Sequence, residues 1–516
     1  MAMRKALPLI GAVAVLIALF AASALAPAAP PPGGKMNVVL ISIDSLRADH
    51  MGLYGYERDT TPNVDDFAKS AAVFENYFST SHLTPISAGS VHTGAHPLRS
   101  GMVNFTSRFR DDLPTIAETL RADGYRTATF GSSPEFGFPI LKDEFSRGFD
   151  AYDPSVLPPS IESSTNFIKT AADGRGTIPV NEATEWMRAA AQDEKPFFLW
   201  MPLGSVHWPY GLQERATYAD RGFDGRFNIW THSARYPQQH LFGTLYGRVY
   251  DGKFYGMEGA VLDDDLRDEF AHLVDTYDDG VRETDRQLRP LLSLLSSSAF
   301  RDNTIVIIES EHGEDLGEHG YVAHYDLHGT ETHVPLIIRA PGIEAQRVAD
   351  LASGVDVAPT LYALLGKTLG SPDGVSFAER LTGDEAPRDA VFMTRTPLWE
   401  RVLATIDDWY LGFVKEDDAR HAYDTAIRTD EWLLIHRLAR SALREYSWYG
   451  RLTGTPVELP EYELYKVSED PFETTNLYAS EPEVAHGLRT RLLEWEQSMT
   501  AVAPPEEPTT VIQPYF

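Results

Sequence analysis

The 516-residue chain contains no cysteine. This absence excludes disulfide bonds, zinc–thiolate sites, iron–sulfur clusters and a thiol nucleophile. Basic residues are also scarce, because 45 Lys and Arg stand against 75 Asp and Glu, for a formal net charge of −30. Such an acidic chain is repelled by the phosphates of nucleic acids and of anionic lipids, so we expect no nucleic-acid partner and no non-specific docking on an anionic lipid surface.

The rest of the composition is that of a folded protein. Hydrophobic residues make up 43% of the chain and charged residues 23%, which excludes disorder as the main state. The length allows one large domain with an appendage, or two to three ordinary domains.

The first 35 residues are predicted to direct export and not to belong to the fold. Arg4 and Lys5 precede an apolar run over residues 7–26, followed by a Pro- and Gly-rich linker. Small residues at the end of the run form a cleavage motif, as in a signal peptide. At about 20 residues, the run could also cross a bilayer as an uncleaved anchor. The rest is therefore expected to be extracytoplasmic, periplasmic or secreted, with membrane contact only through this segment if it is uncleaved.

Strands and helices are predicted to alternate over residues 36–385. The apolar run at 38–43 is typical of a strand buried on both faces of a parallel sheet. The other predicted strands are 125–131, 196–201 and 304–308, and the predicted helices are 113–124, 181–192 and 275–295. This alternation predicts a mostly parallel α/β sheet covered by helices on both faces.

Beyond residue 385 the pattern changes to shorter strands without regular helices between them. They are predicted at 391–393, 409–411, 431–436 and 463–465, before a final helix at 482–499. Residues 386–503 are therefore predicted to form a smaller α+β subdomain with a short antiparallel sheet. Residues 504–516 are expected to be a loose tail.

Two predicted strands lead into side chains that could bind a cation. Asp44 follows the first strand, and Glu311 and His312 follow the strand at 304–308. Carboxyl ends of parallel strands are the usual place for ligands, and carboxylates with an imidazole suit a divalent cation. Taken alone, Asp44 is better explained as a helix cap or loop carboxylate.

Residues 81–94 are rich in small and hydroxyl side chains and are predicted to lead into a short helix that ends at Gly94. A Thr or Ser at the start of this helix would place its oxygen beside free backbone N–H groups and the positive end of the helix dipole. An N-capped surface helix accounts for the same composition equally well.

These residues resemble the sulfatase family of the alkaline phosphatase superfamily. The matching segments are 37–49, 54–56, 60–63, 83–94, 204–210, 311–320, 334–338, 355–360 and 464–477. The resemblance implies an alkaline-phosphatase-like three-layer α/β/α sandwich over residues 36–385. It also implies that the smaller domain helps to wall the active-site cleft.

The chain departs from this family at the nucleophile. Typical sulfatases carry Cys or Ser followed by x-Pro-x-Arg and oxidise the first residue to formylglycine. Alignment on the pair at 93–94 places Thr84 at that position, with Ile86 and Ala88 at the Pro and Arg positions. Oxidation of Thr would give a ketone, so the mechanism of formylglycine enzymes is not available to this chain.

The resemblance also implies one divalent cation held by Asp44, Glu311 and His312, with Thr84 as fourth ligand and nucleophile. Zinc or manganese suits this mixed oxygen and nitrogen set, and calcium is the alternative. Ser45 stands where the family has a second Asp. The site therefore has fewer carboxylates than a typical sulfatase.

Thr at the nucleophile position resembles the phosphodiesterase, phosphonate-ester and phospholipid-headgroup transferase branches of the superfamily. There a metal-bound alkoxide attacks phosphorus and forms a phosphothreonine. We therefore expect hydrolysis of a phosphate mono- or diester, or headgroup transfer, on a small-molecule, lipid-headgroup or glycan ester. By family position, His207 and His324 would contact the non-bridging oxygens or protonate the leaving group. A sulfatase without formylglycine and an inactive binding relative are the alternatives.

Some of these histidines could instead have a purely structural role. His207 could simply pack beside the aromatic residue that follows it, and four histidines crowd the segment around His324. His324 and His328, four residues apart, could share a helical face and hold a second metal ion. The aromatic insertion at 213–263 is expected either near the cleft or as a surface loop.

Overall fold

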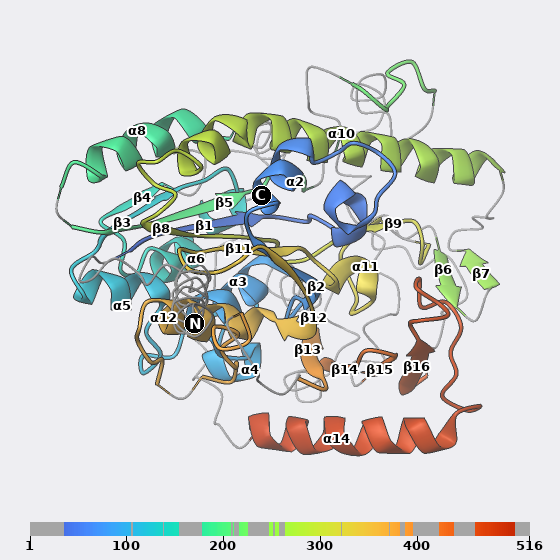
Figure 1. Cartoon of the computed structure of the whole chain (residues 1–516). Coiled ribbons are helices and arrows are strands. Elements are labelled where there is room, and N and C mark those ends of the chain that lie inside the picture. The colour runs from blue at the N-terminus through green and yellow to red at the C-terminus, as the bar shows by residue number, and fades with distance from the viewer. Residues whose placement is uncertain are drawn as a thin grey trace, which may run out of the picture.

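An eight-stranded sheet forms the centre of the structure, a computed structural model, in the order β12-β2-β11-β8-β1-β5-β3-β4 (Figure 1). The structure describes residues 36–104, 107–137, 139–153, 178–193, 195–207, 210, 216–224, 247–250, 253–256, 264–320, 322–370, 372–381, 388–395, 423–437 and 460–500. The predicted fold class, a mostly parallel sheet between helices with a separate short antiparallel sheet, is confirmed.

Strand β1 (Asn37–Ile43) is central and completely buried. It pairs in parallel with β5 (Phe197–Leu203) and with β8 (Thr304–Glu309). Its side chains alternate between two cores, with Val39 and Ile41 on one face and Val38 and Leu40 on the other. Burial on both faces explains why the strand is apolar at consecutive positions.

The sheet continues on both sides of these three strands. Beyond β5, strands β3 (Arg126–Phe130) and β4 (Ala151–Asp153) extend it in parallel. On the other side, β11 (Leu336–Arg339) runs antiparallel to both β8 and β2 (Ala72–Phe78). Strand β12 (Gln346–Ser353) pairs in parallel with β2 at the edge.

Helices cover both faces of the sheet (Figure 1). One layer consists of α2 (Pro62–Ala68), α8 (Val180–Ala190) and the long α10 (Asp264–Leu295). The other layer consists of α3 (Thr84–Thr93), α5 (Ile116–Ala122), α6 (Pro139–Phe145) and α12 (Val357–Leu364). The predicted helices are thus present, although α10 begins eleven residues before the prediction.

Short elements connect these layers. The helical turns are η1 (Ala48–His50), η2 (Gly52–Tyr54), α4 (Pro97–Ser100), η3 (Pro134–Gly137), α11 (Gly329–Thr332) and η5 (Gly354–Asp356). The two-stranded ribbons are β9 (Asp315–Leu316) with β10 (Val322–Ala323), and β6 (Gly247–Tyr250) with β7 (Lys253–Gly256).

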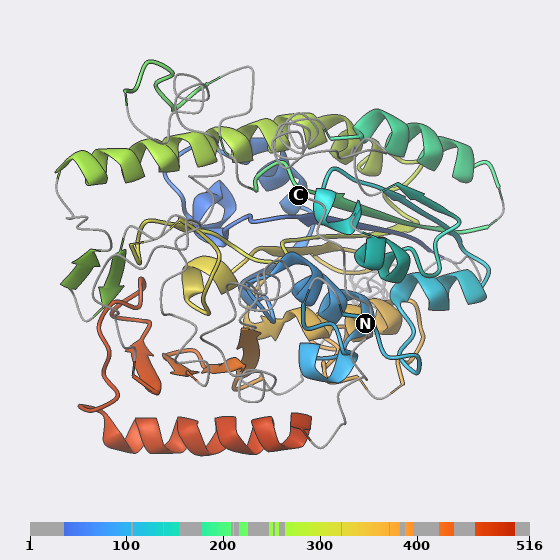
Figure 2. The same cartoon turned by 180° about the vertical axis from the view of Figure 1, so that it is seen from behind.

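A four-stranded antiparallel sheet lies toward the C-terminus. Its strands are β13 (Val391–Arg395), β14 (Asp424–Arg428), β15 (Trp432–His436) and β16 (Tyr462–Lys466). Helix α14 (Pro482–Thr500) runs along this sheet, as the view from behind shows (Figure 2).

Several predictions fall outside the described residues. They are the export segment at 1–35, the strand at 409–411, the tail at 504–516 and most of the insertion at 213–263. Within the described part of the chain, no helix combines the length and apolarity that a membrane span requires.

Candidate active site

The predicted site residues converge at the carboxyl ends of two neighbouring strands. Asp44 follows β1, and Glu311 and His312 follow β8, the strand that pairs with β1 in parallel. Thr84 is the first residue of α3. All four side chains are buried. Parallel pairing places the ends of β1 and β8 at one edge of the sheet, which is why residues 40 and 228 positions apart from Thr84 meet there.

Three of these side chains are within hydrogen-bonding distance of one another. Thr84 Oγ1 lies 3.0 Å from His312 Nε2 and 3.4 Å from Asp44 Oδ1. His312 Nε2 lies 3.2 Å from the same Asp44 oxygen. The hydroxyl group of Thr84 thus faces an imidazole nitrogen and a carboxylate at once.

The backbone orients the His312 ring. Its Nδ1 lies 2.8 Å from the carbonyl oxygen of Gly313, which can only accept, so Nδ1 carries a proton. In the neutral ring, Nε2 then presents its lone pair to the Thr84 hydroxyl group and to a cation, as in metal-ligating histidines. Burial opposes a charge on His312, but the hydrogen bond and charge of Asp44 outweigh burial and raise its pKa.

Glu311 is a buried carboxylate without a hydrogen-bond partner for either oxygen among the described residues. Burial, followed by the nearby charges of Asp44 and Glu309, raises its pKa well above the ordinary value. A buried carboxylate in this condition is costly unless a cation or a proton joins it.

These side chains fit a divalent cation in chemistry. Among the described residues, no three His, Asp or Glu side chains stand close enough together to form a finished coordination shell. The unsatisfied oxygens of Glu311, the carboxylate of Asp44 and the lone pair of His312 nevertheless form a mixed oxygen and nitrogen donor set. This set matches the ligands that zinc and manganese accept in proteins.

His207 and His324 complete the cluster. Their ring centroids are 5.1 Å apart and lie 6.4 Å and 4.1 Å from that of His312. His324 Nδ1 lies 3.2 Å from Glu314 Oε1, which leaves Nε2 on the opposite edge of the ring. Residue 208, against which His207 could alternatively pack, lies outside the described residues.

His328 belongs to a different cluster. The segment before α11 is not helical, so His324 and His328 share no helical face. The His328 ring stacks on His319 at 3.9 Å, and its Nδ1 lies 3.2 Å from Glu473 Oε2. A second metal ion between His324 and His328 therefore finds no support in the structure.

The start of α3 does not present the free backbone N–H groups that the sequence led us to expect. Pro85 has no N–H, and the N–H groups of Ile86 and Ser87 both donate to the carbonyl oxygen of Leu83. Most of the first turn is therefore satisfied locally. The side chain of Thr84, and not a set of free amides, is what this element presents to His312 and Asp44.

Supporting residues around Asp44 escaped the sequence interpretation. Ser45 has a φ of 61°, and its Oγ donates to Asp44 Oδ1 at 3.3 Å. Tyr277 of α10 donates to the carbonyl oxygen of Ser45 at 2.7 Å and accepts from the N–H of Arg47 at 2.9 Å. Ser310 accepts from the N–H of Leu46 and donates to the carbonyl oxygen of His312. No local motif signals the contacts of Tyr277 with residues 45 and 47 or of Ser310 with Leu46, because these partners lie more than 200 residues apart.

Other histidines near Thr84 have structural surroundings. His92 packs edge-on against Trp200, with ring centroids 4.4 Å apart, and His96 packs in the same way against Trp495 at 5.2 Å. Burial lowers the pKa of each to about 3, helped for His96 by nearby arginines. Burial also lowers the pKa of His82 well below its usual value.

Comparison with known proteins identifies similar chains. A match to the family described as Sulfatase spans residues 36–367. An N-acetylglucosamine-6-O-sulfatase of Bacteroides thetaiotaomicron is 24% identical, over 93% of this chain and 89% of that protein. The multifunctional alkaline phosphatase superfamily protein PehA of Trinickia caryophylli is 25% identical, over 64% and 74%. The solved phosphonate monoester hydrolase of Agrobacterium radiobacter superposes with a TM-score of 0.63 at 20% identity, over 90% of this chain and 96% of that one.

Proposed function

Because the chain belongs to the sulfatase family, whose members hydrolyse esters and generally use a divalent metal ion, we propose that it cleaves phosphate or phosphonate esters with Thr84 as nucleophile. The observation that carries this proposal is the buried Thr84 hydroxyl, 3.0 Å from His312 Nε2 and 3.4 Å from Asp44 Oδ1. The similarity to PehA and to a phosphonate monoester hydrolase supports phosphorus as the reacting atom.

Thr84 attacks in the first step. Its Oγ forms a bond to phosphorus while the bond from phosphorus to the leaving oxygen breaks. The hydroxyl proton leaves toward Asp44 Oδ1, the carboxylate oxygen that accepts from Thr84, because His312 Nε2 would bind the cation. The product is a phosphothreonine, from which water then releases the phosphoryl group and restores the Thr84 hydroxyl.

Asp44, Glu311 and His312 would hold the divalent cation, with Thr84 beside it. When bound, zinc or manganese would supply positive charge that lowers the pKa of the hydroxyl group and neutralises phosphoryl oxygens. Ser45 and Tyr277 hold the turn that carries Asp44, so they support this donor set.

His324 and His207 serve the leaving group. Glu314 accepts from His324 Nδ1 and orients the ring, and we assign Nε2 as the donor of a proton to the departing oxygen. His207 lies beside it and is placed to contact a non-bridging oxygen of the substrate. Removing the group that protonates the leaving oxygen is expected to lower kcat most for esters with poor leaving groups.

Sulfate esters are the second candidate. The observation that favours them is the group of similar curated proteins with sulfatase names, including choline-sulfatase of Rhizobium meliloti at 22% identity. The chain has no cysteine, so formylglycine cannot form from one, and sulfate transfer would also have to begin at Thr84.

Substrate class, location and domain limits are further proposals. Small-molecule, lipid-headgroup or glycan esters outside the cytoplasm are consistent with the names of the similar proteins and with the apolar segment at 7–26. A catalytic domain over 36–385 and a subdomain over 386–503 are consistent with the two separate sheets.

Paired assays on 4-nitrophenyl phosphodiester, phosphonate and sulfate esters test the proposal with Thr84→Ala and Thr84→Ser. Loss of the nucleophile is expected to lower kcat by at least about 1,000-fold, whereas Ser keeps a hydroxyl group and part of the activity. Intact mass after brief exposure to the phosphodiester should show a phosphoryl adduct on Thr84. The matched control is Ser87→Ala on the same helix, because that hydroxyl only donates to the carbonyl oxygen of Ser81. Full turnover by Thr84→Ala would refute the mechanism.

Metal content and thermal unfolding test the donor set independently of turnover. About one equivalent of zinc or manganese is expected, and saturating it at 100 times its Kd should add about 2.7 kcal/mol to the free energy of unfolding. Asp44→Asn and Glu311→Gln should reduce this metal-dependent gain. If neither EDTA nor added metal changes the unfolding curve, the assignment of these residues as metal ligands is wrong.

A further inference from the structure

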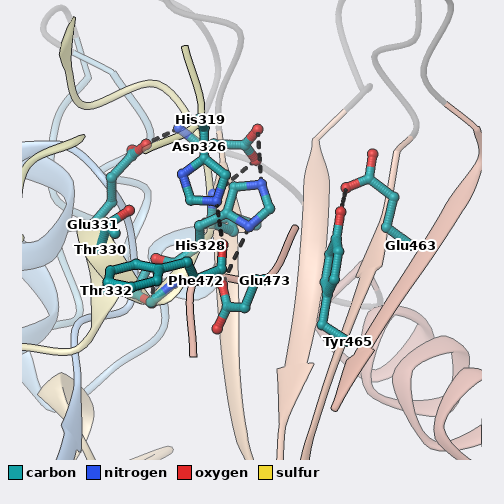
Figure 3. A network of polar contacts seen from close by, with 12 residues as sticks. His319, Asp326, His328, Thr330, Glu331, Thr332, Glu463, Tyr465, Phe472 and Glu473 are labelled. Atoms are coloured by element: carbon teal, nitrogen blue, oxygen red, sulfur yellow. Dashed lines mark hydrogen bonds and ion pairs between the residues drawn. The ribbon is translucent and has the colours of Figure 1, made fainter. Parts of the chain in front are cut away.

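The segment that carries His324 is held by side chains from the C-terminal sheet. It runs from β10 to α11 and includes Asp326 and His328, which lie between the large sheet and β16 (Figure 3). The N–H of Asp326 donates to Glu331 Oε2 at 2.6 Å, so the segment is also tied to α11.

Arg437, which follows β15, makes the main contact. Its side chain is 0% exposed, and Nη1 pairs with Asp326 Oδ1. Its Nε and Nη2 donate to the two oxygens of Glu463, at 3.1 Å and 2.8 Å. Tyr465 donates to Glu463 Oε2 at 2.7 Å and fixes that carboxylate (Figure 3).

Arg395, the last residue of β13, makes a second contact. Its Nε donates to the carbonyl oxygen of Tyr325, the residue that follows His324. Its Nη1 lies 2.9 Å from Asp424 Oδ2, which also lies 3.6 Å from Arg437 Nη1. The two residues after His324 are therefore each bound by an arginine of the small sheet: the first through its carbonyl oxygen and the second through its carboxylate.

The backbone before His324 is held in an unfavourable conformation. Ala323 has a φ of 92°, one of three positive values at non-glycine residues in the described part of the chain. Such a conformation costs about 1–3 kcal/mol and persists only when the surroundings impose it. The β9–β10 ribbon, which ends at Ala323, and the two arginines that contact the residues after His324 supply that constraint.

A gain in stability does not by itself explain this arrangement of buried charges. Burying two arginines among three carboxylates has a large desolvation cost, and apolar residues of similar volume often stabilise a protein more. A planar guanidinium with several donors does, however, fix its partners in direction as well as distance. Fixed direction is what a proton donor at an active site requires.

We propose that Arg437 and Asp326 are positioning residues, through which the C-terminal sheet sets the place of His324 beside Thr84. This inference rests on the proposed function, because it assigns His324 to the leaving group. Neither residue touches the substrate: Arg437 is fully buried, and both act through the backbone that leads to His324.

Asp326→Ala, Asp326→Asn and His324→Ala test the inference on a series of esters whose leaving groups differ in pKa. Asp326→Ala cuts the link but leaves Arg437 paired with Glu463, so the fold is expected to survive. Asp326→Asn keeps an acceptor for Arg437 and for the N–H of Leu327. Arg437→Lys is less suitable, because it would leave buried carboxylates without donors.

We expect Asp326→Ala to lower kcat by about 100-fold on esters with poor leaving groups and by about tenfold or less on 4-nitrophenyl esters, with KM nearly unchanged. His324→Ala should show the same dependence on the leaving group, and Asp326→Asn should recover most of the activity. A purely structural role would lower kcat equally for all leaving groups.

The outcomes separate this inference from the proposed function. If His324→Ala steepens the leaving-group dependence and a folded Asp326→Ala does not, the positioning role is wrong and the proposed function stands. If Thr84→Ala keeps its turnover, the proposed function fails whatever the Asp326 variants do. If His324→Ala leaves the dependence unchanged, the role of His324 and its positioning both fail.

Discussion

Gly313 shows how closely the backbone is packed around the site residues. Its N–H donates to the carbonyl oxygen of Glu331 at 2.7 Å, and the next N–H donates to that of Thr330 at 2.9 Å. A Cβ atom on Gly313 would lie 2.2 Å from the Thr330 carbonyl oxygen. The sequence Glu-His-Gly-Glu therefore needs glycine because α11 passes directly against it.

Gly313→Ala is expected to displace either α11 or the turn that carries His312. Overpacking against backbone typically lowers the free energy of unfolding by about 1–3 kcal/mol, and we expect the upper end here. We also expect kcat to fall more than a loss of folded protein would explain, because His312 and Glu314 lie on either side of Gly313 and would be displaced with it. Urea unfolding and kcat on the best ester measure both effects. Gly487→Ala in α14, where a Cβ atom meets nothing within 4 Å, is the matched control.

Single residues of the site differ in how well the sequence predicts them. The positions of Asp44 and His312 at strand ends could be predicted because both strands are apolar on both faces, although Asp44 alone suggested no site. Thr84 could be located only by alignment on the matching pair at 93–94, because the residues around it depart from the family motif. Tyr277 and Arg437 could not be predicted, since each acts on a residue 232 or 111 positions away. Such contacts depend on how whole helices and strands pack, so they cannot be predicted from the residues next to them in the sequence.

At the scale of elements, α14 packs against the C-terminal sheet and shares a hydrophobic core with it. Leu492 is fully buried against Ile427, Leu434 and Leu464 of that sheet. Helical spacing of apolar residues predicted this helix almost to its ends. By contrast, all ten residues of α3 are buried, so its sequence has no alternation of an apolar and a polar face, and only its end, at the C-cap Gly94, could be predicted.

Leu492→Ala is expected to lower the free energy of unfolding by about 2–5 kcal/mol, because the cavity adds to the lost burial. Glu494→Ala, on the exposed side of the same helix, should stay within about 0.5 kcal/mol of the parent protein. Chemical denaturation followed by tryptophan fluorescence measures the difference. Equal effects of the two substitutions would show that α14 does not pack as described.

At the scale of the whole molecule, buried neutral histidines make stability depend on pH. Burial lowers the pKa of His92 to about 3, whereas an unfolded His titrates near about 6.5. The unfolded chain therefore binds more protons between these values. The contribution of His92 is complete above the unfolded pKa and is lost as the pH falls through this window.

Between pH 7 and pH 5, one such histidine removes about 2 kcal/mol from the free energy of unfolding. His92→Leu should abolish that part of the loss, and His92→Leu with His96→Leu should abolish about twice as much, since the pKa of His96 is also about 3. Urea unfolding at the two pH values tests this. An unchanged pH dependence in both variants would mean that these rings titrate in the native protein as they do in the unfolded chain.

The central position of β1 has a consequence for how the protein is made. Val38 pairs with Phe198 on one side and with Ile305 on the other, so β1 is translated well before either of its neighbours. At about 5–20 residues per second, the ribosome needs on the order of 15–50 seconds to deliver the second of them. Throughout that time an apolar strand lacks its partners, and a nascent chain in this state needs a chaperone more than the finished enzyme does.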